Sequence, residues 1–174
     1  MTEQSAAAWP GVLRAVADSD AAGVRALIGG CFAEYDGCVL DPDGIDAWMA
    51  TPASSYAGKG GQFWVLSVPG GATLAACVGW APEADGRAEL KNLYVRASAR
   101  RRGLGRRLVQ LVEEAARGYG ADTVLLWSDT RFLDAHRLYE DLGYQRTGQR
   151  ALYDPSNSIE YGFAKALPPV PPPG

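Results

Sequence analysis

The spacing of hydrophobic positions predicts an alternation of strands and helices along the chain. Apolar and polar residues alternate at the start, whereas the apolar residues after Asp20 recur at helical spacing. We expect strands over residues 12–16, 63–68, 73–81, 88–95, 123–127, 144–153 and 158–167. We expect helices after Asp20, over residues 45–49, from Leu104 to the glycines at 118 and 120, and over residues 134–142. The composition of residues 52–61 predicts a loop.

The order of these elements predicts an α/β fold. The segment TVLLW at residues 123–127 is a short continuous apolar run, which is typical of a buried strand with a parallel neighbour. It follows a strongly amphipathic helix, so residues 88–127 form a strand-helix-strand unit that requires parallel pairing. Other strands are joined by short turns such as Pro69-Gly70-Gly71. We therefore expect a mixed sheet with helices on its faces.

Composition is that of an ordinary globular domain. The 174 residues are 47% hydrophobic and 21% charged, with a net charge of -3, which suits one packed core and disfavours a nucleic-acid backbone as the main partner. We expect an N-terminal extension over residues 1–10, one domain over 11–167 and a proline-rich flexible tail over 168–174. Because no apolar run has the length of a membrane span and no signal-peptide pattern is present, we expect a cytoplasmic protein without a membrane partner.

The cysteines and the histidine do not indicate a metal site. Cys31, Cys38 and Cys77 form no CxxC pair, so the sequence predicts neither a zinc knuckle nor a disulfide framework. His136 is the single histidine, which excludes a multi-histidine site. We therefore expect no metal cofactor.

The most informative segment is a basic, glycine-bearing turn between the strand at residues 88–95 and the next helix. Gly103 and Gly105 allow backbone amides to approach a ligand at the helix N-terminus, where N–H groups are unpaired. Arginines around these glycines add charge suited to phosphate: Arg100, Arg101, Arg102, Arg106 and Arg107. The segment predicts a pyrophosphate site. The alternative is a solvated helix start after an ordinary turn.

The turn resembles the pyrophosphate-binding arm of the GNAT acetyltransferases. Arg100, Gly103 and Gly105 fit R/Q-x-x-G-x-G/A, whereas the lysine of a Walker loop is missing and Leu108 replaces the third glycine of a dinucleotide fingerprint. The resemblance implies a single-domain GNAT-like α/β fold, with a mixed, mostly antiparallel sheet, a splayed central strand pair and helices on both faces. It also implies acetyl-CoA as the cosubstrate.

A second segment, AHRLYEDLGY at residues 135–144, resembles the family's helix that carries a catalytic tyrosine. The resemblance implies that Tyr139 faces the thioester sulfur, where a phenol can donate a proton to the leaving thiolate. The alternative is that Tyr139 belongs to the apolar stripe of a short helix.

One position departs from the family pattern. Phe132 stands where many relatives have an asparagine, so we expect Asp129, Thr130 or Arg131 to replace that contact with the cofactor. We place His136 toward the adenosine side or solvent. The resemblance implies the following cofactor-binding residues: Leu93, Tyr94, Val95, Arg100, Arg101, Arg102, Gly103, Leu104, Gly105, Arg106, Asp129, His136 and Tyr139.

The resemblance also implies direct transfer of the acetyl group to an amine. The main-chain N–H of Val95 is the candidate donor to the thioester carbonyl. An alkylamine is mostly protonated at neutral pH, and Glu89 is the candidate base that deprotonates it. The alternatives to Glu89 are Asp129, Glu34 and Glu160.

The acceptor is the least defined part of the prediction. Acidic residues crowd the segment 34–46, which favours a cationic acceptor or is an exposed loop without a role: Glu34, Asp36, Asp41, Asp43 and Asp46. Four aromatic residues line the pocket or pack in the core: Tyr35, Trp48, Tyr56 and Trp80.

We expect N-acetylation of a small-molecule primary amine by a monomer or homodimer. Protein N-termini or lysines are the alternative acceptors. A coenzyme A-binding regulatory module without turnover and a nucleic-acid-binding protein are alternatives of other classes.

Overall fold

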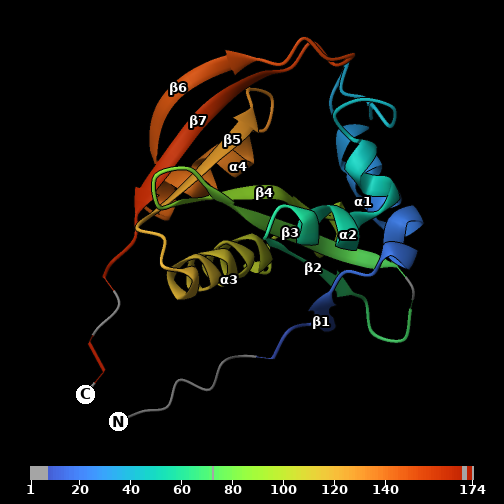
Figure 1. Ribbon diagram of the computed structural model, residues 1–174. Coiled ribbons are helices and arrows are strands. Elements are labelled where there is room, and N and C mark those ends of the chain that lie inside the picture. The colour runs from blue at the N-terminus through green and yellow to red at the C-terminus, as the bar shows by residue number, and fades with distance from the viewer. Residues whose placement is uncertain (1–7, 72, 170–171, 174) are drawn as a thin grey trace.

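The computed structural model describes residues 8–71, 73–169 and 172–173, which form an open sheet with helices on both faces (Figure 1). The sheet has seven strands in the order β1-β2-β3-β4-β5-β7-β6. The strands are β1 Val12–Ala15, β2 Gln62–Ser67, β3 Leu74–Glu83, β4 Arg87–Val95, β5 Thr123–Asp129, β6 Gln145–Ala151 and β7 Ile159–Ala166. The helices are α1 Ala21–Phe32, α2 Pro52–Gly58, α3 Leu104–Tyr119 and α4 Leu133–Asp141, with short 3-10 helices η1 Asp18–Asp20, η2 Ala47–Ala50 and η3 Ala97–Ala99. The predicted fold class is confirmed.

The central strands β4 and β5 pair over only part of their length. Their parallel pairing runs from Arg87 opposite Thr123 to Glu89 opposite Leu125, although β4 continues to Val95. The other edge of β4 stays paired with β3 as far as Val95 opposite Ala76. The edge of residues 90–95 that faces β5 therefore has no strand partner within the described residues. The sheet is splayed at its centre, as predicted.

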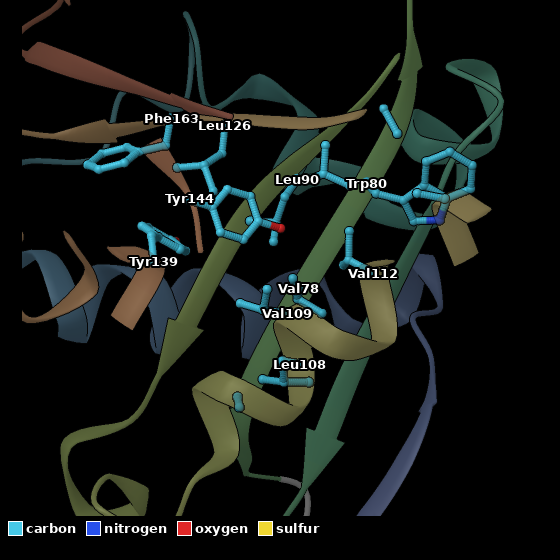
Figure 2. Packing of buried hydrophobic residues seen from close by; sticks show 14 of the residues in the cluster. Val78, Trp80, Leu90, Leu108, Val109, Val112, Leu126, Tyr139, Tyr144 and Phe163 are labelled. Carbon is cyan, nitrogen blue, oxygen red and sulfur yellow. The ribbon is translucent and has the colours of Figure 1, made fainter. Parts of the chain in front are cut away.

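Two hydrophobic cores lie on opposite faces of the sheet, because successive side chains of a strand point to opposite sides. On one face, Val78 and Trp80 of β3 belong to a cluster with Val109 and Val112 of α3 (Figure 2). The apolar stripe of α3 predicts this packing. On the other face, α1 and α2 pack against β2 and β3, and Tyr56 of α2 is buried there.

The second helix differs from the prediction, because residues 52–58 form α2 where a loop was expected. Pro52 occupies the first turn, where its missing N–H costs no hydrogen bond. The ring of Tyr56 packs between those of Trp48 and Phe63. Packing of one apolar face therefore stabilises a short helix whose composition is loop-like.

Other elements shift at their ends. The helix expected at residues 45–49 is the 3-10 helix η2. Residues 1–7 of the expected extension and residues 170, 171 and 174 of the expected tail lie outside the described residues. Of the helices that the structure describes, none is long and apolar enough to cross a membrane.

Candidate active site

A cavity lies beside the open edge of β4. It has a volume of about 740 Å³ and is bounded by the end of β4, the start of α3 and the start of α4. Most residues predicted to bind the cofactor line this first cavity: Leu93, Tyr94, Val95, Arg100, Arg101, Gly103, Leu104, Gly105 and Arg106. The predicted turn and strand thus meet at one site.

The glycine turn shapes one wall of the first cavity. Gly103 precedes α3 with a φ of 73°, in the left-handed region that glycine adopts without steric cost. The backbone N–H groups of the first turn of α3 have no partner within the helix and carry the positive end of its dipole. Arg101 and Arg106 lie exposed on the same wall. This wall is suited to an anion.

Arg100 has a structural partner on the same wall. Its guanidinium donates two hydrogen bonds of 2.6 Å to the carboxylate of Glu34, and its Nε donates to the Val95 carbonyl at 2.9 Å. The hydrogen bonds from Arg100 lower the pKa of Glu34. The pair joins the residues after α1 to the end of β4. The carboxylate of Glu34 already compensates the positive charge of Arg100.

A second, smaller cavity adjoins the first. It has a volume of about 300 Å³, and its lining includes Glu89, Asp129 and Glu160. Tyr94 and Phe132 line both cavities. The two spaces therefore meet at these two rings, next to the end of the β4–β5 pairing.

Comparisons with known proteins identify the family. Residues 26–144 match the family described as Acetyltransferase (GNAT) family. The chain belongs to this family. Over 131 residues it is 33% identical to the probable N-acetyltransferase family 8 member 5 of Mus musculus, covering 72% of this chain and 55% of the relative. The chain spans about half the length of the curated relatives it matches.

Solved structures share the GNAT fold. An acetyltransferase of the GNAT family from Staphylococcus aureus Mu50 superposes with a TM-score of 0.78 at 16% identity, covering 90% of this chain and 99% of that one. The protein yncA from Salmonella typhimurium, solved with its cofactor acetyl-CoA, has a TM-score of 0.67 at 17% identity and covers 94% of this chain and 97% of its own.

Four residues predicted to contact the cofactor in this GNAT domain do not line the first cavity: Arg102, Asp129, His136 and Tyr139. Arg102 is exposed but is not part of its wall, and Asp129 lies in the second cavity. His136 is buried, and its Nε2 lies 2.9 Å from the Asp129 carbonyl oxygen. The expectation that His136 faces the adenosine or solvent is wrong, because α4 turns it inward. Burial lowers the pKa of its imidazole.

Tyr139 belongs to the hydrophobic core around α3 and lines neither cavity. It is 4% exposed, and its ring packs against Tyr144 and Phe163 at centroid distances of 5.9 and 5.7 Å (Figure 2). Burial raises the pKa of its phenol. Residues 135 and 138 of the same helix reach the first cavity instead.

The carboxylates of the second cavity differ in environment. The side chain of Glu89 is 15% exposed and lies 3.3 Å from Lys91 Nζ. Burial raises the pKa of Glu160 despite a hydrogen bond of 2.8 Å from Arg150. Burial also acts to raise the pKa of Asp129, but hydrogen bonds from Arg131 outweigh it and the net shift is downward. Glu34, the remaining alternative base, does not line this cavity.

The acidic segment contributes one wall residue. Asp46 lines the second cavity, and burial raises its pKa, whereas the other four acidic residues of segment 34–46 do not reach the cavity. Of the aromatic candidates, Tyr35 lines the first cavity and Trp48 the second. Tyr56 and Trp80 pack in the core. Segment 34–46 thus contributes less to the acidic wall of the second cavity than the sequence indicates.

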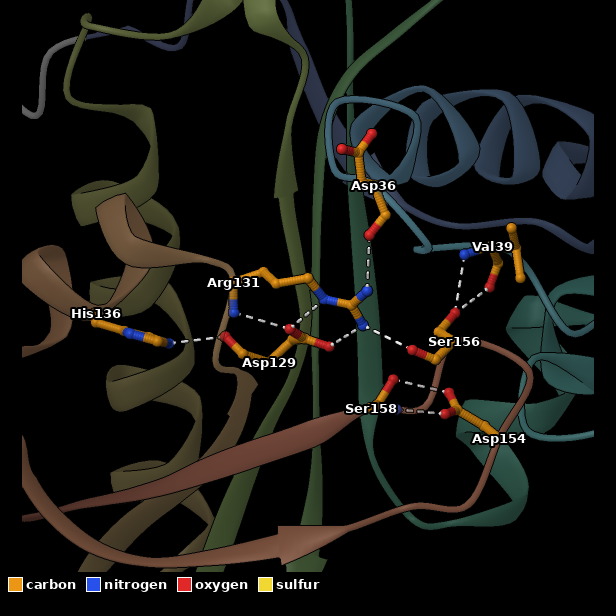
Figure 3. Close-up of polar contacts among 8 residues, drawn as sticks. All are labelled: Asp36, Val39, Asp129, Arg131, His136, Asp154, Ser156 and Ser158. Carbon is orange, nitrogen blue, oxygen red and sulfur yellow. Dashed lines mark hydrogen bonds and ion pairs between the residues drawn. The ribbon is translucent and has the colours of Figure 1, made fainter.

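Arg131 joins three segments around the second cavity (Figure 3). Its guanidinium donates to both carboxylate oxygens of Asp129 at 2.9 Å and to the carbonyls of Asp36 and Ser156 at 3.1 Å. The Ser156 hydroxyl accepts from the Val39 N–H at 2.8 Å and donates to the Val39 carbonyl at 2.9 Å. We call this set the Arg131 clasp: it fixes residues 36–39 to the β6–β7 turn.

Sequence reasoning missed several wall residues. In the first cavity these are Cys31, Ala97, Phe132, Asp134, Ala135 and Leu138; in the second they include Lys59, Lys91, Asn92 and Arg150. Lys91 and Asn92 belong to the same strand as Glu89, so their closeness to it could have been predicted from the sequence. Arg150 and Lys59 belong to segments far from Glu89 along the chain, and no local pattern indicates that they line the same cavity. Within the described residues, no group of three or more His, Cys, Asp or Glu side chains is arranged to hold a metal ion.

Proposed function

We propose that this chain is an acetyl-CoA-dependent N-acetyltransferase that transfers an acetyl group directly to a primary amine of a small molecule. One observation carries the proposal: a cavity bounded by the glycine turn and a cavity lined by carboxylates meet at the open edge of β4. The N-acetyltransferase relatives and the acetyl-CoA bound to yncA support it.

The first cavity fits acetyl-CoA. Arg101, Arg106 and the amides of the first turn of α3 would hold the pyrophosphate. The edge of residues 90–95 that lacks a strand partner would bind the pantetheine amides as an added strand does. When bound, acetyl-CoA supplies an activated acetyl thioester.

The Val95 N–H is oriented for the role of carbonyl donor. The Arg96 N–H donates to the Ala75 carbonyl of β3 at 2.8 Å. Because neighbouring residues of a strand direct their amides to opposite edges, the Val95 N–H faces away from β3, toward the gap beside β5. A donor fixed there stabilises the developing oxyanion more than the ground-state carbonyl.

Glu89 is the proposed base, and Glu160 is its rival. Glu89 is the last residue of β4 that pairs with β5, so its side chain lies where the two cavities approach each other. A carboxylate there accepts a proton from the ammonium form of the acceptor. Glu160 reaches the same cavity with a raised pKa, which also suits a base.

Tyr139 is the proposed proton donor to the leaving thiolate. Its raised pKa keeps the phenol protonated at neutral pH, as a donor requires. Because Tyr139 does not line the first cavity, donation requires the thiolate to come within hydrogen-bonding distance of the hydroxyl.

The second cavity favours a small acceptor. Its volume of about 300 Å³ and the Arg131 clasp on its rim leave space for a compact amine rather than an extended peptide. A protein N-terminus or lysine is the alternative acceptor of the same chemistry. A coenzyme A-binding module without turnover would not need the carboxylates of this cavity.

A panel assay tests the function. Purified protein is mixed with acetyl-CoA and single amines or short peptides, and free thiol release is followed together with product mass. We expect acetylation of at least one small amine and weaker or no acetylation of peptides. Acetylation confined to peptides would reverse the acceptor assignment. Acetyl-CoA binding without transfer to any acceptor would favour the regulatory module.

A further inference from the structure

Four aromatic rings form the wall between the two cavities, and we call them the aromatic partition: Phe32, Tyr35, Tyr94 and Phe132. Tyr94 and Phe132 each contact both spaces, with ring centroids 6.4 Å apart and planes at 82°. Tyr35 lies 4.9 Å from Phe132, and Phe32 lies 5.7 Å from Tyr94. The rings therefore contact one another and narrow the passage where the two cavities meet.

Hydrogen bonds of the surrounding backbone fix the main chain at Phe132, the ring that contacts the other three. The Phe132 N–H donates to the Asp129 carbonyl at 3.0 Å, and its own carbonyl accepts from the His136 N–H at 3.2 Å in the first turn of α4. Tyr94 stands on β4, paired with Cys77 of β3. The backbone positions of both rings are therefore set by regular structure, and the ring contacts hold the side chains against one another.

We propose that the aromatic partition restricts the acyl donor to short chains of about two or three carbons, with Phe132 as the specificity-determining residue. This inference rests on the proposed function. A carbonyl carbon that is reached from both cavities lies at their boundary, beside Tyr94 and Phe132. Each further methylene of the acyl group must then press against a ring or occupy the small cavity that the amine needs.

The identity of residue 132 makes the restriction a property of this chain. Phe132 adds an apolar surface that contacts three other rings. A small side chain here would join the two cavities more widely.

Acyl-CoA selectivity tests the proposal. With one accepted amine, kcat/KM is measured for acetyl-, propionyl-, butyryl- and hexanoyl-CoA. We expect the parent to lose at least about tenfold between propionyl- and hexanoyl-CoA. Phe132→Ala should raise the hexanoyl-to-acetyl ratio at least about tenfold, and Phe132→Leu should give an intermediate ratio if the alanine variant folds poorly. Leu133→Ala, an exposed neighbour outside both cavities, is the control and should keep the parental ratio.

A binding arm separates this inference from the proposed function. Calorimetry in the absence of amine measures the affinities for acetyl-CoA and hexanoyl-CoA. The ratio of these affinities is the binding counterpart of the hexanoyl-to-acetyl ratio of kcat/KM. A parent that binds and uses hexanoyl-CoA as well as acetyl-CoA overturns the inference, as does a folded Phe132→Ala variant with the parental ratio. A parent that selects acetyl-CoA in binding but transfers to no amine contradicts the proposed function and supports the partition.

Discussion

At the scale of single residues, arginines of the same turn have different surroundings. Arg100 is neutralised by Glu34, whereas no carboxylate of the described residues lies within ion-pair distance of Arg101 or Arg106. Exposed cations beside unpaired helix amides attract phosphate most strongly. Arg100 therefore stabilises the fold, whereas Arg101 and Arg106 are available to bind the ligand.

Replacing Arg106 with Gln should weaken acetyl-CoA binding about fivefold, since an exposed charge pair contributes about 1 kcal/mol. The loss should shrink as salt is raised. Calorimetry at low and high salt measures both effects. Arg102→Gln removes the same charge from the same turn outside the cavity and should bind as the parent does. Equal losses in the two variants would indicate general attraction rather than contact.

Gly105 is a less suitable test position. A Cβ there would lie 2.9 Å from Leu138 Cδ2, so Gly105→Val would displace the Leu138 side chain, which also lines the cavity, as well as obstruct the ligand. Loss of binding in that variant has two physical causes, whereas the arginine variants have one.

Glu89→Gln preserves shape but cannot accept a proton, so it should remove most acetyl transfer at neutral pH while acetyl-CoA affinity persists. If Glu89 is the base, the low-pH limb of kcat/KM flattens in this variant, and raising the pH restores part of the rate as free amine appears. Glu160→Gln is the matched comparison. A parental profile in Glu89→Gln with a changed profile in Glu160→Gln would transfer the role to Glu160, whose pKa is already raised.

Tyr139→Phe deletes one hydroxyl and keeps the ring contacts with Tyr144 and Phe163. We expect kcat to fall roughly tenfold to a few hundredfold with little change in acetyl-CoA affinity, as for loss of a single proton donor. Single-turnover measurements show whether chemistry limits the rate. Unchanged chemistry in this variant would leave Tyr139 a core residue only.

At the scale of elements, the Arg131 clasp is the main polar connection around the second cavity. Arg131→Ala should lower the free energy of unfolding by about 2 to 3 kcal/mol, less than for a fully buried pair because the arginine side chain is 27% exposed. Urea denaturation at neutral pH measures the change. The reason is that the carboxylate of Asp129, 7% exposed, would lose its guanidinium partner and keep the hydrogen bond from the backbone N–H of residue 131.

A control and a pH test accompany this variant. Arg137→Ala removes a partner of Asp134 in a pair whose side chains are 75% and 92% exposed, and stability should change by less than about 0.5 kcal/mol. Because Arg131 lowers the pKa of Asp129, its contribution is complete above the unfolded carboxyl pKa and is lost as pH falls through the folded pKa. A difference between parent and Arg131→Ala that persists in acid would contradict this account.

At the scale of the whole molecule, His136 couples folding to pH. Burial lowers its pKa, so between that lowered value and about 6.5 the unfolded chain binds the proton that the folded chain excludes. The free energy of unfolding should fall as pH drops below about 6.5 and level off below the folded pKa. His136→Gln should flatten this slope in urea titrations, while the loss in stronger acid, which carboxylates cause, should remain. If the variant keeps the parental slope, groups other than His136 cause the pH dependence of the free energy of unfolding.

The sequence by itself determined the strands, the long helices and the position of the cofactor turn, because these depend on local spacing, whereas α2 depends on tertiary packing. Alternation along residues 63–68 and 73–81, the stripe of α3 and the order strand, glycine turn, helix are visible in short windows. The family motif also located the open end of β4, which the β4–β5 register confirms.

Only the tertiary structure decided which side chains share a site. Arg100 meets a carboxylate 66 positions earlier, Ser156 meets Val39 across 117 positions, and His136 turns into the core. Phe132 becomes a wall between two cavities because α1, β4 and the start of α4 place four rings together. Such contacts depend on how distant segments pack around the sheet, and a local pattern of polar and apolar residues carries no information about that packing.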